Sequence, residues 1–116
     1  MRHLKKTKKL SRKKGPRQAL LKNLAQSIIL YEKVKTTEAK AKVVKPQLER
    51  MITRAKKDNL HSRRQIMSKL PAKNAARKMF EVIGPRYKDR KGGYLKITKL
   101  NTRKGDSAKM VQIEFV

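Results

Sequence analysis

The 116-residue sequence contains no cysteine and no tryptophan, and aromatic residues make up only 4% of it. The absence of cysteine excludes disulfide bonds and thiolate metal sites, and it fits a reducing compartment such as the cytoplasm. With so few aromatic rings, base stacking is not expected to be the main device for binding a nucleic acid. The longest run of large apolar residues covers only residues 28–31, so no membrane-spanning segment is expected.

Groups typical of catalysis are missing as well. His61 and Ser62 are neighbours in the sequence, but adjacent side chains on a helix or strand do not face each other, so they are no catalytic dyad. The eight acidic residues are scattered, and no carboxylate pair or zinc-ligand spacing is present. Gly92 and Gly93 lack the phosphate-loop pattern. We expect no enzyme activity, no metal, no cofactor and no small-molecule substrate.

Acidic residues are scarce, with 8 Asp and Glu against 34 Lys and Arg, and the net charge is +26. A chain this positive repels itself unless a polyanion is bound, and the phosphate backbone of a nucleic acid is the matching polymer. Residues 1–15 are densely basic, and residues 2–17 contain only two large apolar residues, Leu4 and Leu10. We expect residues 1–15 to form a basic extension that is mobile in the free protein, and residues 16–116 to form one globular domain.

Helical periodicity dominates residues 16–83. The first helix is expected over residues 16–32, with apolar residues at every fourth position, at Leu20, Leu24 and Ile28. Thr37 is expected to cap a second helix over residues 38–57, which Pro46 must either kink or split in two. Two further helices are expected over residues 62–70, burying Ile66, Met67 and Leu70, and over residues 71–83, ended by Gly84 and Pro85.

The period changes to two beyond residue 93, which indicates strands. Residues 94–100 and 110–116 alternate between apolar and polar residues, and the turn-rich segment between them predicts a hairpin. Residues 33–36 are short and β-branched and predict one more strand. The predicted fold is α+β in two layers, of order α-β-α-α-α-β-β, with the helices packed on one face of a small sheet.

The candidate backbone-binding residues are basic residues of the extension, of the polar face of the first helix and of three further clusters. Both residue types suit contact with backbone phosphates, since Arg can bind a phosphate through two donors and Lys offers a point charge. The candidates are Arg2, Lys5, Lys6, Lys8, Lys9, Arg12, Lys13, Lys14, Arg17, Lys22, Arg63, Arg64, Arg86, Lys88, Arg90, Lys91, Arg103 and Lys104.

Six segments, in order along nearly the whole chain, resemble a known family. They are MRHLKK, RQALLKNLAQSII, KTTEAKAK, LHSRRQ, GPRYKDRKGGYLKITK and RKGDSAKMVQIE. The chain is similar in these segments to ribosomal protein seventeen of the bacterial large subunit. The resemblance implies a structural, non-catalytic protein of the cytoplasmic ribosome. It also implies binding to large-subunit ribosomal RNA and neighbouring ribosomal proteins, near the exit of the nascent-peptide tunnel.

Two other functions are weighed against this one. A DNA-binding nucleoid or regulatory protein would need the third and fourth helices to form a helix-turn-helix, with Pro71 between them. The fourth helix shows mostly Ala, Lys and Met, which offer little polar reach toward base edges. A small enzyme acting on RNA is disfavoured because no acid/base pair is present.

Overall fold

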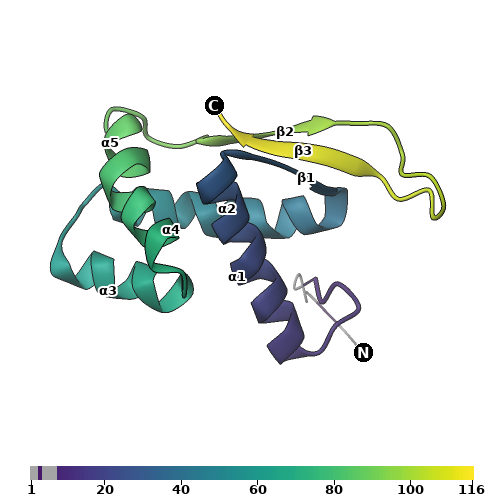
Figure 1. Ribbon diagram of the computed structural model, residues 1–116, viewed down its shortest axis with the longest axis horizontal. Helices are drawn as coiled ribbons and strands as arrows, with labels where there is room; N and C mark the ends of the chain where they lie inside the picture. Colours follow the sequence, from purple (N-terminus) through teal and green to yellow (C-terminus); the bar gives the residue numbers. More distant parts are fainter. Residues whose placement is uncertain (1–2, 4–7) are drawn as a thin grey trace.

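The structure, a computed structural model, describes residue 3 and residues 8–116. The helices lie on one side of a small sheet, which makes two layers (Figure 1). In this part of the chain the elements are α1 (Lys14–Tyr31), β1 (Lys33–Thr37), α2 (Glu38–Ala55), α3 (Leu60–Lys69), α4 (Lys73–Lys78), the π-helix η1 (Met79–Ile83), α5 (Gly84–Arg86), β2 (Leu95–Lys99) and β3 (Met110–Phe115). The predicted α+β class is confirmed. The predicted order also holds when the consecutive α4, η1 and α5 are counted as one helical segment.

The sheet is antiparallel, with strand order β1-β3-β2. Ile113 of the central strand lies opposite Val34 of β1 and Ile97 of β2. Since alternate side chains of a strand point to opposite faces, the apolar set of all three strands faces one way. That face packs on α2, which contacts every strand, and the opposite face is left open by the described helices (Figure 1).

The core lies between the sheet and the helices. Its fully buried side chains include Ile28, Ile29, Val44, Leu48, Ile52, Ile66, Leu70, Met79, Ile83 and Ile113. On α1 the buried stripe runs through Leu21 and Ala25, while Leu20 and Leu24 lie partly buried beside it. Met67 was predicted to be buried but is 55% exposed, because α3 packs through the narrow stripe of Ser62, Ile66 and Leu70.

Pro46 does not divide α2. The helix runs unbroken from Glu38 to Ala55, so of the two outcomes expected at Pro46, a kink or a split, the split does not occur. Pro46 and Lys42, whose carbonyl loses its helical partner, both lie on the exposed side. Water can therefore bond the free carbonyl, while Val44 and Leu48 hold the helix against the core.

Gly84 and Pro85 do not end the fourth helix, so that prediction is wrong. Gly84 has φ −55° and continues the helix, and its N–H bonds the carbonyl of Met79 across the π turn. A Cβ at Gly84 would lie 3.3 Å from the carbonyl oxygens of Ala55 and Met79. Glycine is thus required here by close approach to α2, and not by a left-handed turn.

One predicted helix start and one predicted helix cap also differ from the structure. α1 begins at Lys14, two residues before Pro16, which sits in the first turn where a missing N–H is tolerated. Thr37 precedes α2, but its side chain caps no N–H. Instead the N–H of Glu38 donates to the carbonyl of Lys109, 2.9 Å away at the start of β3, so the neighbouring hairpin satisfies it.

Candidate nucleic-acid interface

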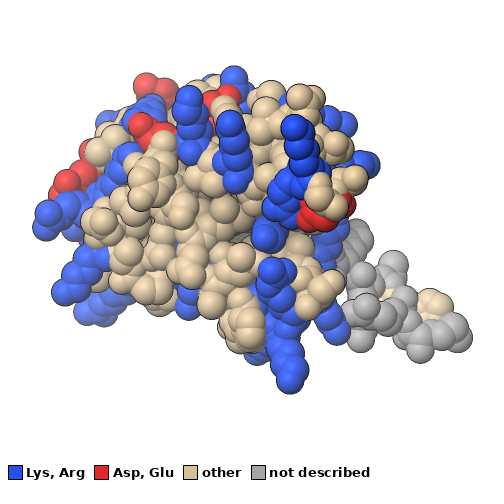
Figure 2. All heavy atoms as spheres, turned by 45° about the vertical axis from the view of Figure 1, so that its right-hand side comes forward, with Lys and Arg blue, Asp and Glu red and all other residues tan. Residues whose placement is uncertain are grey.

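Positive charge covers most of the surface and acidic residues are few. On the face shown in Figure 2, Lys and Arg side chains project around a central uncharged area, with only a few Asp and Glu among them. Six acidic residues of the described part form ion pairs, namely Glu32, Glu38, Asp58, Glu81, Asp106 and Glu114. They engage only seven of the described basic residues, so most of the positive charge in this part of the chain has no internal partner.

Three of the predicted binding residues form ion pairs with acids at the surface. Arg63 donates to Asp58 at 2.7 Å and lies over the ring of Phe80, 5.1 Å from its centroid. Arg103 donates to both carboxylate oxygens of Asp106, at 3.1 and 2.6 Å. The Arg103 guanidinium lowers the pKa of the Asp106 carboxyl to about 2. These arginines order the surface around them and are less available to phosphate.

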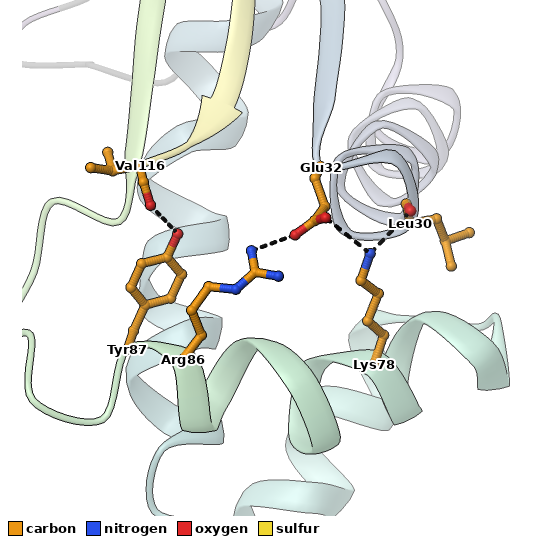
Figure 3. A network of polar contacts seen from close by, with 6 residues as sticks. All are labelled: Leu30, Glu32, Lys78, Arg86, Tyr87 and Val116. Carbon is orange, nitrogen blue, oxygen red and sulfur yellow. Dashed lines mark hydrogen bonds and ion pairs between the residues drawn. The ribbon is translucent and has the colours of Figure 1, made fainter.

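Arg86 is the third, and it belongs to a network that joins α1, α4 and α5 (Figure 3). It forms an ion pair with Glu32, and the Arg86 guanidinium lowers the pKa of that carboxyl. Glu32 ends α1 in the left-handed conformation, with φ 64°, which is uncommon for a residue with a Cβ. Lys78 donates to the carbonyl of Leu30 at 3.1 Å and lies 3.9 Å from Glu32. The network thus fixes the turn between α1 and β1.

The other described candidates are exposed or partly exposed and form no ion pair within the described residues. They are Lys8, Lys9, Arg12, Lys13, Lys14, Arg17, Lys22, Arg64, Lys88, Arg90, Lys91 and Lys104. Arg2, Lys5 and Lys6 lie outside the described residues. Figure 1 places the start of α1, α3, the segment after α5 and the β2–β3 loop at separate corners of the molecule. The candidates are therefore spread over several sides and do not form one patch.

The end of the predicted extension is tied to the domain. Leu10 is partly buried and packs against the core cluster, although the sequence suggested that it was too isolated to do so. The carbonyl of Leu10 also accepts a 2.8 Å hydrogen bond from Arg12. The residues directly before α1 therefore have a defined place beside the domain.

Sequence reasoning missed a basic group on the open face of the sheet. Lys33 and Lys96 lie on either side of Glu114 across the three strands, and Lys35 lies one pleat further along β1. Lys96 is paired with Glu114 at 3.3 Å, whereas Lys33 and Lys35 have no ion pair among the described residues. The alternation Lys33-Val34-Lys35 carried this signal, because a strand with one buried face exposes every second side chain.

The aromatic residues serve the core more than the surface. Tyr87 packs against Tyr94 and Phe115, with ring centroids 5.2 and 6.1 Å apart. Tyr31 is 73% exposed, and it is the exposed ring among those the structure describes. The arrangement favours contact through charge and backbone shape over stacking on a row of rings. None of the described helices is both long and apolar enough to cross a bilayer.

The fold and surface define a small, strongly basic α+β protein whose charge suits a nucleic-acid backbone. Comparison with known proteins gives the family. The ribosomal protein L17 family matches residues 20–116, and the chain belongs to it. It is therefore a structural ribosomal protein and not an enzyme, and its place is the ribosome, in the cytoplasm.

Similar proteins match along almost their whole length. The large ribosomal subunit protein bL17 of Hydrogenobaculum sp. is 50% identical over 117 residues, which cover 100% of this chain and 99% of that protein. The protein of the same name from Roseobacter denitrificans is 49% identical over 116 residues, 100% of this chain and 83% of its own. That of Carboxydothermus hydrogenoformans is 47% identical over 108 residues, 93% of this chain and 96% of its own.

Proposed function

We propose that the chain is a structural protein of the large ribosomal subunit that binds and stabilises the large-subunit ribosomal RNA. The observation that carries this proposal is the pairing of charges. Six acids occupy seven cations, while most Lys and Arg side chains of the described chain have no acidic partner. Each phosphate that such a cation neutralises releases condensed counterions, which drives binding.

The proposed interface has two parts. Residues 1–15 form the RNA-binding extension, which includes Arg2, Lys5 and Lys6, and residues 16–116 form the domain that docks beside it. The unpaired candidates contact phosphate directly. Arg63, Arg86 and Arg103 act mainly by holding the surfaces that present them. Because the basic groups lie at several corners, the domain fits between RNA segments better than against one flat RNA surface.

The resemblance supports the place of the protein in the particle. We propose a position on the outer surface of the large subunit, near the exit of the nascent-peptide tunnel. Neighbouring large-subunit ribosomal proteins are then further partners. In this position the protein stabilises folded RNA from the outside of the subunit and catalyses no reaction.

Sedimentation of a bacterial lysate tests this function. The full chain, carrying a C-terminal tag, should be found in the large-subunit fraction and should stay there in moderate salt. Ribonuclease treatment should release it. Recovery with chromosomal DNA would contradict the ribosomal function and support the nucleoid or regulatory alternative. Recovery in the free protein fraction alone would also contradict the ribosomal function.

A further inference from the structure

The structure contains a groove to which the candidate interface has assigned no role. It runs between α1 and α2, has a volume of about 330 Å³, and is lined by Gln18, Leu21, Lys22, Ala25, Gln47, Arg50, Met51 and Lys69. The lining residues of α1 are spaced by 3, 1 and 3 positions and those of α2 by 3 and 1. On each helix they therefore lie on one face, and the groove is lined by these two faces. Lys69, the last residue of α3, borders it as well.

The groove combines an apolar floor with a polar rim. Leu21, Ala25 and Met51 are 8%, 3% and 5% exposed and form the floor. Gln18 and Gln47, one on each helix, are exposed at the rim. An amide both donates and accepts hydrogen bonds, so two amides at the rim of one groove suit the edge of a nucleobase.

The charge of the rim has one sign. Lys22, Arg50 and Lys69 line the groove and are exposed, and no Asp or Glu of the described residues lines it. None of the three forms an ion pair within the described part of the chain. By contrast, a second groove along α3 and α4 includes Glu81, and Arg63 covers its Phe80 ring. Of these two grooves, the one between α1 and α2 is therefore better suited to an anionic ligand.

We propose that this groove holds a single unpaired nucleotide of the bound RNA. The flat, weakly polar base rests on the Leu21, Ala25 and Met51 floor, and the two amides bond its edge. Lys22, Arg50 and Lys69 contact the phosphates on either side, and the Arg50 guanidinium can also stack on the base. The volume is at the lower end for ligand pockets and suits one nucleotide. The groove lies one turn after the end of the extension, so both parts can follow one RNA strand.

This inference rests on the proposed RNA binding and adds to it a site for one nucleotide. Because the natural chain has no cysteine, a Gln47→Cys variant can carry a single thiol-linked photo-crosslinker at the rim. The matched control is Asn23→Cys, on the exposed side of α1 and outside the groove. Both labelled chains are assembled into large subunits and irradiated, and the cross-linked partner is sequenced.

The label at position 47 should attach to one nucleotide that is unpaired in the large-subunit RNA. The label at position 23 should not attach to that nucleotide. Attachment at position 47 to a neighbouring protein or to paired nucleotides, or the absence of any cross-link, would overturn the groove proposal. If the labelled chains do not enter large subunits although they are folded by circular dichroism, the proposed function itself fails.

A binding measurement supplies a second readout. The full-length Gln18→Ala, Gln47→Ala double variant keeps every charge and should bind transcribed large-subunit RNA about tenfold more weakly, since two hydrogen bonds are lost. Asn23→Ala should bind as the parent does. If the folded double variant binds the RNA as tightly as the parent does, the groove proposal is contradicted, while the proposed RNA binding of the protein still stands.

Discussion

Replacement of Arg86 by Gln should destabilise the free protein in a way that depends on pH. In the parent, Arg86 forms an ion pair with Glu32, whose backbone turns from α1 into β1 with φ 64°. The variant leaves Glu32 with Lys78 alone, 3.9 Å away. The turn then loses the partner that holds its carboxylate in place.

The expected loss of unfolding free energy is about 1 kcal/mol at neutral pH, the upper end for an ion pair of this exposure. The Arg86 and Glu32 side chains are 38% and 41% exposed, so solvent screens much of their attraction. The loss of one partner from a buried ion pair destabilises a protein several times more, but the Arg86–Glu32 pair is not buried. The Lys88→Gln variant removes an exposed charge without an ion pair in the described chain and should stay within about 0.5 kcal/mol of the parent.

The sign of the pH dependence follows from the lowered pKa of Glu32. A carboxyl whose pKa is lower in the folded than in the unfolded state stabilises the fold above its unfolded value, near pH 4.5. It loses that contribution as the pH falls through the folded value. Urea unfolding followed by circular dichroism, at neutral pH and at successively lower pH, measures this. The gap between parent and Arg86→Gln should be full at neutral pH and should close below the folded pKa. Equal stability at neutral pH, or a gap that does not change with pH, would refute the reasoning.

Three other predictions concern the fold and the charges. Gly84→Ala should destabilise by about 1 kcal/mol, because its Cβ would lie 3.3 Å from two backbone oxygens. The control for this substitution is Gly15→Ala, in open space on α1, which should stabilise by about 0.5 kcal/mol. Ile113→Ala, fully buried in the central strand, should cost about 3 kcal/mol. In RNA binding, Arg64→Gln should flatten the slope of log affinity against log salt by about 0.8, whereas Arg63→Gln should flatten it less.

Thermal and urea unfolding of the Gly84, Gly15 and Ile113 variants checks the predictions on stability. Filter binding over a range of salt concentrations checks the prediction on the salt slope of the two arginine variants. A stabilising Gly84→Ala would show that the α2 backbone yields at that contact. An Ile113→Ala variant as stable as the parent would place that side chain outside the core. Equal slopes for the two arginine variants would show that pairing with an acid does not withdraw an arginine from phosphate.

The alternation and helical periods of the sequence predicted the layers and the hairpin because they reflect which face each element buries. They did not predict the helix ends. The conformation of Gly84 depends on its close approach to α2. At the start of α2, the Glu38 N–H bonds the carbonyl of Lys109, just before β3, and not the Thr37 side chain. Such contacts join residues far apart in the sequence, so no local pattern reveals them.

For the interface, the sequence showed where positive charge occurs but not which charges are already satisfied. Arg63 and Arg64 look equivalent in the sequence, yet only Arg63 meets an acid within the described residues. The groove likewise depends on two helices that bring Gln18 and Gln47 to one place. Side-chain pairing and inter-helix geometry are tertiary properties, and they separate the cations that pair with acids from those without an acidic partner among the described residues.

Ultraviolet cross-linking of intact large subunits, followed by sequencing of the RNA attached to this chain, tests the proposed function most directly. The proposal predicts attached fragments of large-subunit RNA, on peptides from both the extension and the domain. It also predicts that the modified peptides carry unpaired cations such as Lys22 and Arg64. Attachment to small-subunit RNA alone, or no attached RNA in particles that contain the chain, would contradict it.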